Sequence, residues 1–454
     1  MRPGRAERPG RDVLEEHDKG GGTMMPAISS SRLRVFAPIV LIGLAGCRTF
    51  SPAPMDEVSF IERAQTQSRD GITVTAAVLS SDEAQAVFDV KLYKKKIQPI
   101  WIEIDNATDQ TLAFLPRSVD PDYLSALEVA QMSHWTWSKK ANREKRAYFY
   151  DQRMRYPVPP GETVSGFVYG NRDLGARWVR VTVIGERSAE HFEFVFELPG
   201  FTADYHRIAD VEIYAEDEVV DLDDDGLLAW IETQPAFVTN KDGSKTGDPL
   251  NLVIIGDEES VWPAFLRMGW DPTAALSAGS AVKTGVFGVF GGAWRHAPIS
   301  DLYVWGRPQD IALQKVRSNI HYRNHLRLWK APVTYKGLPV AIGQISRDIG
   351  SRITSKSSTL TTHRIDPDVD ETRASLLQDF LWGQSLAVFG WAGGVGEIDM
   401  DSPRGNLTGD PFFTDGRRAV MLLAAGTTPI EEIERFDWVE PEATGPETED
   451  ADRP

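Results

Sequence analysis

The fold is decided by two neighbouring stretches of the chain, HLRLW at residues 325–329 and LPVAIGQIS at residues 338–346. Both stretches are predicted to be strands of one sheet. Because successive side chains of a strand point to opposite faces, His325, Arg327 and Trp329 share one face and the two leucines share the other. The leucines can pack into a core, which leaves a polar face that is available for a site.

The segments around this pair mix helix and strand signals. NLVIIG at 251–256 and LYVWG at 302–306 predict further strands, and residues 258–268 predict a helix. We therefore expect an α+β domain over residues 205–435. The apolar run at 381–396 is interrupted by polar residues and is too short to cross a bilayer, so it predicts a core helix.

Residues 57–200 show the alternation of short strands instead. Strands are predicted at 72–79, 97–105, 111–115, 165–170, 178–185 and 192–198. Turn residues separate them, a pattern typical of an antiparallel β-sandwich domain. A basic segment at 138–153 lies between two of these strands. It predicts a solvated loop or helix face, with a ligand-binding segment as the alternative.

Residues 1–46 have the features of a bacterial leader that ends at Cys47. Arg32 and Arg34 precede an uncharged apolar run at 35–44, which has the length of a signal-peptide core and is too short for a membrane-spanning helix. The sequence LAGC at 44–47 then resembles the lipobox of bacterial lipoproteins. We predict that Cys47 carries the lipid, the alternative being a secretory signal with a chance cysteine.

The flanking residues refine this prediction. Residues 1–23 are rich in Arg, Gly and charge, unlike an export segment, so Met24 or Met25 is a better start than Met1. Arg48 after the cysteine favours the outer membrane, with the protein lipid-anchored in the cell envelope and facing the periplasm. Fatty chains of the palmitate class bind a membrane almost permanently when several share one residue.

The two ends of the exported part predict unstructured segments. Residues 47–56 comprise the lipidated cysteine and a short tether containing proline and serine. Residues 441–454 form an acidic, proline-rich tail that we expect to be disordered.

Composition narrows the classes of partner. The 454-residue chain carries 49 Lys and Arg against 66 Asp and Glu, a net charge of −17 at pH 7. Binding to phosphate backbones depends on clustered Lys and Arg, so we expect no nucleic-acid partner. With the one cysteine committed to lipid, no disulfide or thiol chemistry is expected.

Several blocks together resemble one known family. They are GDPLNLV at 247–253, GW at 269–270, GRPQD at 306–310, HLRLW at 325–329, and His363 with IDPDVD at 365–370. In this order they are similar to the LssY C-terminal domain, over about residues 235–425. The resemblance implies a bacterial envelope protein whose biochemical role is uncharacterised. Relatives often carry membrane phosphatase-like or DedA-like segments, which are missing here, so no phosphatase activity is carried over.

Histidine and carboxylate side chains suggest a transition-metal site. His325, His363 and Asp366 could supply nitrogen and oxygen ligands for zinc, manganese or iron, and an open metal position could activate water. The further candidates for catalysis or anion binding are Asp370, Asp310, Arg327 and Arg307.

The alternative for the aspartates is structural. They could form the turn and N-cap of a helix that begins near Asp370, held by Arg364 or Arg373.

A calcium site is a second metal prediction. Asp221, Asp223, Asp225 and Glu232 occupy EF-hand positions around the glycine of DLDDDG at 221–226. The preceding segment alternates like a strand, which does not fit the entering helix of an EF-hand. The alternative is a strand-to-helix turn in which Asp225 caps the helix.

Two functional interpretations follow. The favoured one is a non-enzymatic envelope lipoprotein that binds or assists another envelope component, a protein or a glycan. Tryptophans in polar contexts support this interpretation, namely Trp135, Trp137, Trp305 and Trp329. The second is a metal-assisted hydrolase acting on an anionic, phosphate-containing envelope substrate.

Overall fold

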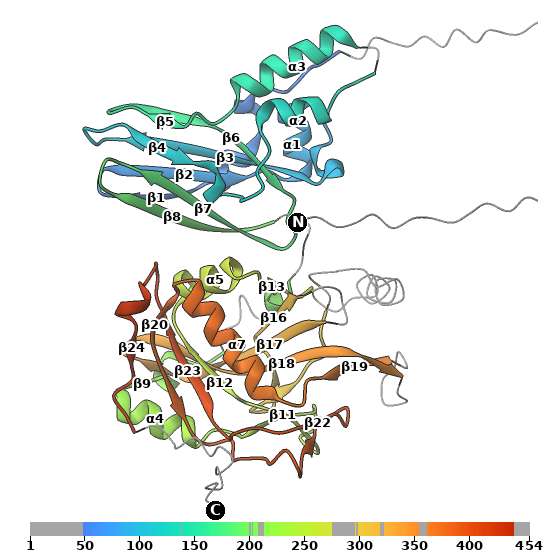
Figure 1. The fold of residues 1–454 in the computed structure, drawn as a ribbon, viewed down its shortest axis with the longest axis vertical. Helices are drawn as coiled ribbons and strands as arrows, with labels where there is room; N and C mark the ends of the chain where they lie inside the picture. The colour runs from blue at the N-terminus through green and yellow to red at the C-terminus, as the bar shows by residue number, and fades with distance from the viewer. Residues whose placement is uncertain are drawn as a thin grey trace, which may run out of the picture. The chain divides into compact units, whose positions relative to one another are not determined.

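The computed structural model describes residues 49–439 except 137, 199–200, 202, 208–212, 275–295, 297, 318–321 and 354–360. The predicted leader at 1–46, the predicted lipidation site Cys47 and the predicted disordered tail at 441–454 lie outside the described residues. The described part is mostly β, with several sheets and six α-helices, and has a multidomain character (Figure 1). Within it, none of the helices combines the length and apolar character needed to cross a membrane.

The N-terminal region, residues 49–198, contains eight strands and three α-helices (Figure 1). The strands are β1 Gln65–Arg69, β2 Ile72–Val78, β3 Ile97–Asn106, β4 Leu112–Leu115, β5 Pro157–Val158, β6 Thr163–Asn171, β7 Ala176–Ile184 and β8 Ala189–Glu197. The helices are α1 Ser81–Phe88, α2 Ala126–Met132 and α3 Lys139–Asp151, with 3-10 turns η1 Met55–Glu57, η2 Ser59–Arg63, η3 Leu92–Lys95 and η4 Pro116–Ser118. All six predicted strands are confirmed to within three residues at each end.

These strands form two four-stranded antiparallel sheets that share one core. Their orders are β1-β2-β3-β6 and β5-β4-β7-β8. Ile100 and Ile102 of β3 belong to the same buried cluster as Val179 and Val181 of β7. The alternation read from the sequence therefore places the apolar side chains of both sheets together.

The helices of this region cover the other face of the first sheet. Ser80 and Ser125 begin α1 and α2 with complete capping boxes, which fix where each helix starts. Phe88 of α1, Phe149 of α3 and Phe167 of β6 pack in one aromatic cluster. The basic segment at 138–153 is thus largely helix α3, which buries Phe149 and Ala141 together with the polar side chains of Asn142 and Lys145.

The C-terminal region, residues 213–439, carries the remaining elements (Figure 1). Its strands are β9 Val220–Leu222, β10 Phe237–Thr239, β11 Thr246–Pro249, β12 Leu252–Ile255, β13 Asp271–Pro272, β14 Tyr303–Val304, β15 Arg307–Pro308, β16 Ile311–Val316, β17 Arg323–Tyr335, β18 Leu338–Ile353, β19 Thr361–Ile365, β20 Leu386–Ala392, β21 Arg404–Gly405, β22 Pro411–Phe412, β23 Arg418–Leu423 and β24 Glu434–Arg435. Its helices are α4 Asp224–Glu232, α5 Glu258–Arg267 and α7 Val369–Trp382, with 3-10 turns η6 Glu216–Glu218 and η7 Ile430–Glu432; η5 Asp204–Arg207 precedes the region.

The centre of this region is a ten-stranded mixed sheet. The main path runs β13-β16-β17-β18-β12-β23-β20-β24, with β19 paired to β18 and β9 paired to β17. The long hairpin of β17 and β18, which contains the two stretches that decide the fold, turns at Lys336 and Gly337, both with positive φ. The predicted mixture of helix and sheet is confirmed.

The two faces of the sheet are covered by different helices. Leu326 and Leu328 pack with Leu376 and Phe380 of α7 and with residues of α5. On the opposite face Trp329 packs with Leu227 and Ile231 of α4. That face of β17 is apolar from Trp329 onward, whereas its first residues, Arg323 to Arg327, point polar side chains the same way.

The core helix predicted at 381–396 is wrong. Helix α7 ends at Trp382, and residues 386–392 form strand β20, which pairs with β23. The break lies at Gly383 and Gln384, where Gln384 adopts a positive φ of 54°. A short apolar run is compatible with a buried strand as well as with a buried helix, and in this fold it forms a strand of the sheet.

Candidate functional site

A buried group of polar side chains lies on the three adjacent strands β16, β17 and β18. We call it the central polar cluster, and it consists of Gln314, Arg323, His325, Arg327, Gln344 and Asp348. The register explains why they meet. His325 lies opposite Gln314 on one side, and Arg327 lies opposite Gln344 on the other.

Asp348 neutralises the first half of this cluster. Its Oδ2 lies 2.6 Å from His325 Nε2 and 3.5 Å from Arg323 Nε, and Arg323 also donates to Gln314 at 2.7 Å. Burial lowers the pKa of His325 to about 4, although the nearby Asp348 carboxylate opposes the shift. The histidine is therefore neutral over the physiological range.

Arg327 anchors the second half. Its guanidinium donates to Gln344 Oε1 at 2.9 Å and to the Ser300 carbonyl at 2.9 Å. Burial lowers its pKa to about 10, while the carboxylates of Asp248 and Asp348 oppose the shift. The Nε2 of Gln344 has no hydrogen-bond partner among the described residues, so the network is not completely satisfied.

The structure does not bring the backbones of His325 and His363 together. The two residues pair with Ser346 and Ser351 of β18, about 16 Å apart along that strand at roughly 3.3 Å per residue. The side chain of His363 lies outside the described residues. The transition-metal site of His325, His363 and Asp366 stays a prediction, and the register does not favour it.

Arg307 and Asp310 are engaged with each other. They form an ion pair, and Asp310 Oδ2 accepts a hydrogen bond from the Lys330 backbone at 2.7 Å. Burial raises the pKa of Asp310, with Arg307 opposing the shift. Arg307 also donates to Tyr214 at 3.2 Å. These contacts tie the turn before β16 to β17.

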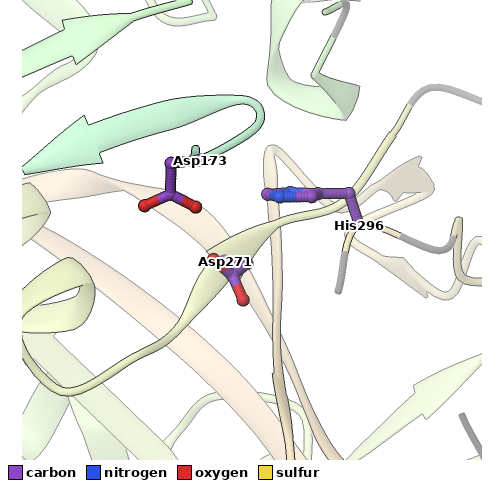
Figure 2. A group of neighbouring side chains, drawn as sticks. All are labelled: Asp173, Asp271 and His296. Atoms are coloured by element: carbon purple, nitrogen blue, oxygen red, sulfur yellow. The ribbon is translucent and has the colours of Figure 1, made fainter. Parts of the chain in front are cut away.

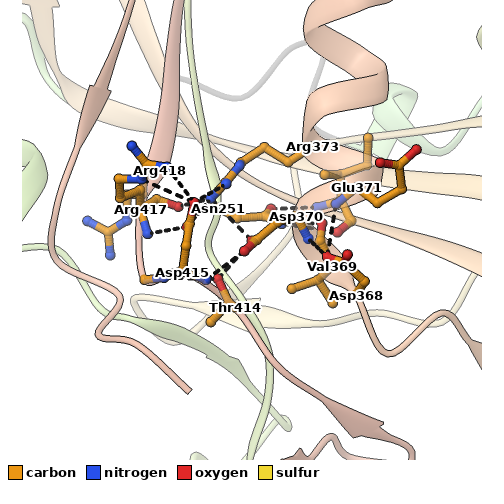
Figure 3. A network of polar contacts seen from close by, with 12 residues as sticks. Asn251, Asp368, Val369, Asp370, Glu371, Arg373, Thr414, Asp415, Arg417 and Arg418 are labelled. Carbon is orange, nitrogen blue, oxygen red and sulfur yellow. Dashed lines mark hydrogen bonds and ion pairs between the residues drawn. The ribbon is translucent and has the colours of Figure 1, made fainter. Parts of the chain in front are cut away.

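The candidate aspartates at 366–370 lie at the start of α7. Asp366 Oδ1 accepts from the Asp368 backbone at 3.2 Å. Asp368 is the N-cap of α7 and accepts from the backbone of Asp370 and Glu371, each at 3.1 Å (Figure 3). The structural alternative thus describes these contacts, with the cap two residues before Asp370.

Asp370 continues into a network that joins α7 to the turn before β23. Its carboxylate accepts from Thr414 at 2.8 Å and lies 3.2 Å from Arg373, which also binds Asp415 through two nitrogens at 2.8 and 2.9 Å (Figure 3). Arg373 and Arg417 lie over the ring of Trp391. Burial raises the pKa of Asp370, whereas hydrogen bonds from Arg373 contribute to a lowered pKa at Asp415.

The predicted calcium ligands are separated by helix α4. Asp223 is its N-cap, accepting from Gly226 at 2.9 Å, and Asp221 accepts from Thr334 at 2.8 Å. Because α4 begins at Asp224, Glu232 at its other end lies about 12 Å along the axis. The cap is Asp223 rather than Asp225, and the four side chains do not surround one point.

Of the tryptophans predicted to be interaction residues, Trp329 is placed differently from what its polar context suggested. Trp329 is fully buried in the core beside α4. Trp305 is 37% exposed and lies over Arg307. Trp137 lies outside the described residues.

A different polar group was missed by sequence reasoning. We call it the Asp-Asp-His cluster, and it consists of Asp173, Asp271 and His296 (Figure 2). One ligand atom from each residue lies within 4.8 Å of the other two. Asp173 follows β6, Asp271 begins β13, and His296 stands apart from both in the sequence. No spacing motif could reveal a group assembled from three distant segments.

A cavity of about 470 Å³ adjoins this cluster. Asp173 and Asp271 line it, together with the arginines Arg117, Arg172, Arg177 and Arg180. Arg177 is buried against Asp120 at 3.1 Å, and its Nε has no hydrogen-bond partner among the described residues. Carboxylates and guanidiniums thus line the same cavity, which could bind an anion or a cation.

Fold and site together define a β-rich protein with a mixed α/β C-terminal region and two buried polar clusters. The fold does not assign a chemistry to this class. Residues 231–417 match the family model described as the LssY C-terminus. The resemblance read from the sequence blocks is confirmed. No curated protein matches the chain. The matched residues include the central polar cluster, Asp271 and His296, but not Asp173.

Proposed function

We propose that this protein is a bacterial envelope lipoprotein, held through lipid on Cys47 and facing the periplasm, whose folded body binds another envelope component. The ordered leader pattern, from Arg32 and Arg34 through the apolar run to LAGC at 44–47, supports the anchor. Arg48 supports the outer membrane as its location. A lipid anchor needs no second membrane element.

The folded body is proposed to consist of a β-sandwich domain at 57–200 and an LssY C-terminal-like domain at 205–435. The core shared by the two four-stranded sheets supports the sandwich arrangement. Sandwich domains commonly present loops or sheet faces to partners, so a protein or glycan ligand is expected.

One observation favours binding over catalysis in the LssY-like part. The predicted catalytic groups with described side chains are held by neighbouring residues: His325 by Asp348, Arg327 by Gln344, and Arg307 by Asp310. A general base must reach its substrate, whereas His325 is only 7% exposed and has a lowered pKa.

A metal-assisted hydrolase of an anionic envelope substrate is the second candidate. The Asp-Asp-His cluster beside the arginine-lined cavity is the observation that favours it. Its donor set would hold a divalent ion, and the arginines would bind phosphate.

The anchor is tested by comparing the wild type with Cys47→Ser in cells. The wild type should incorporate labelled palmitate and sediment with outer membranes, whereas the variant should do neither. Equal membrane association of the two proteins, without label, would refute the lipoprotein proposal.

Chemical cross-linking of intact cells should then capture a defined envelope partner with the wild type. A phosphoester screen with and without added zinc addresses the hydrolase candidate.

A further inference from the structure

The Asp-Asp-His cluster has the donor chemistry of a metal centre. Two carboxylates and one imidazole are ligands that suit zinc, manganese and iron, and none of them requires a thiol. Asp271 is 3% exposed and His296 is 1% exposed, while Asp173 is half-buried. Figure 2 shows the three side chains converging from different segments.

The imidazole of His296 is oriented as a metal-binding ring would be. Its Nδ1 lies 2.8 Å from the carbonyl oxygen of Pro272, which can only accept, so Nδ1 carries the proton. In the neutral ring the lone pair is then on Nε2. A backbone carbonyl on the second nitrogen is the usual arrangement for histidines that bind metals.

Packing fixes this orientation. The ring of Phe201 lies against the imidazole with centroids 4.9 Å apart. On another side Gly175 has a φ of +83°, and a methyl group there would come within 3.1 Å of His296 Cε1. The close approach of the backbone therefore depends on glycine, and the ring has little freedom to turn.

We propose that Asp173, Asp271 and His296 together bind one divalent transition-metal ion of the zinc class. Ligand atoms around a tetrahedral ion with bonds of 2.0–2.2 Å lie about 3.4 Å apart. The three ligand atoms lie within 4.8 Å of one another, so binding draws the side chains together by at most about 1.4 Å. Rotation of the half-buried Asp173 supplies this movement.

Three protein ligands leave a fourth position open, as in catalytic rather than structural zinc sites. Asp173 and Asp271 also line the cavity of about 470 Å³, so that position faces space that a small ligand can enter. Arg117 and Arg172 are exposed at its rim and form no ion pair with the described residues. The fourth ligand is water or an oxygen of a small anion.

This inference does not rest on the proposed function. The metal centre can be present whether or not Cys47 carries lipid and whether or not the body binds a partner. The metal-assisted hydrolase candidate depends on this centre, but the centre does not depend on hydrolysis.

The test is zinc binding by the full chain in detergent, after treatment with a chelator and dialysis. Isothermal titration calorimetry with zinc alone should give one strong site per chain. His296→Ala and Asp271→Asn should each weaken that site by about 100-fold or more, since even outer-shell partners of metal sites cost about 10- to 100-fold. The matched controls are His134→Ala and Asp109→Asn, both at exposed positions, and should bind as the wild type does.

Three results would overturn the proposal: no strong site in the wild type, undiminished binding in both cluster variants, or equal loss in the controls. If Asp271→Asn or His296→Ala does not fold, Asp173→Asn carries the test, because its side chain is half-buried in the loop between β6 and β7. Gly175→Ala adds a second readout. Its methyl group displaces the imidazole without removing a ligand, so zinc should bind about 10-fold more weakly. The unfolding midpoint of this variant is compared with that of the wild type in parallel.

Discussion

The central polar cluster and the Asp-Asp-His cluster both place charged groups out of water, but they differ in how the charge is balanced. On β17 and β18, Asp348 lies against His325 and Arg323, so opposite charges meet within one sheet. In the Asp-Asp-His cluster, two carboxylates face one imidazole beside a cavity. The first is dominated by cationic side chains around one carboxylate, the second by anionic ones.

The difference in charge balance distinguishes two roles of buried polar side chains, a structural role and a ligand-binding role. A network that closes on itself holds strands in register and contributes to a unique fold, but its side chains are poorly placed to meet a substrate. A group in which two carboxylates and one imidazole converge offers a ligand set that favours a cation. Stability measurements should therefore respond most to the first cluster, and ligand measurements to the second.

The largest effect is expected from Asp348→Ala. The substitution leaves His325 and Arg323 buried without their shared carboxylate, which costs about 3–5 kcal/mol of unfolding free energy. Urea denaturation followed by tryptophan fluorescence measures it. Asp109→Ala at an exposed turn is the control and should stay within about 0.5 kcal/mol of the wild type. A loss below 1 kcal/mol at Asp348 would mean that the cluster is not a structural network.

The next effect is a loss of stability in acid that depends on His325. Its pKa is about 4 in the folded protein and about 6.5 in an unfolded chain, so the unfolded state binds the proton first as the pH falls. The stability is complete above pH 6.5 and decreases by about 3 kcal/mol in total as the pH reaches 4. Unfolding free energies measured over this range should show that slope, and His325→Gln should remove it. An unchanged slope in the variant would contradict the burial argument.

Much of this fold was predictable because it depends on local alternation. The strands of the N-terminal region and the hairpin of β17 and β18 follow from side chains that alternate in and out of a core. The strand at residues 386–392 was not predicted, because a short apolar run does not distinguish a buried helix from a buried strand.

The site was much less predictable. His325 and Arg327 were correctly assigned to one polar face of a strand, yet their partner Asp348 lies on the next strand and no motif links them. Asp368 as a helix cap follows from its position before an amphipathic stretch. Asp173, Asp271 and His296 meet only because three distant segments converge, and that is decided by tertiary packing.

Zinc should stabilise the folded protein through the second cluster and not the first. At a free zinc concentration 100 times the dissociation constant, binding adds about 2.7 kcal/mol to the unfolding free energy. The zinc-induced shift in melting temperature should vanish in His296→Ala and persist in Asp348→Ala. Differential scanning fluorimetry distinguishes the two variants. Loss of the zinc effect in Asp348→Ala alone would reverse the roles of the clusters.

The smallest effect is expected at Asp223, where a carboxylate sits at a helix end rather than in a cluster. Asp223→Ala removes the hydrogen bond to the Gly226 backbone and should cost about 1 kcal/mol of unfolding free energy. Millimolar calcium should shift neither the wild type nor the variant, because Glu232 lies at the far end of α4 and cannot share an ion with Asp223. Asp225→Ala is the matched control, since Asp225 lies within the helix and does not cap it. If calcium stabilised the wild type but not Asp223→Ala, the EF-hand spacing would be functional after all, and α4 would have to begin several residues later when the ion is bound.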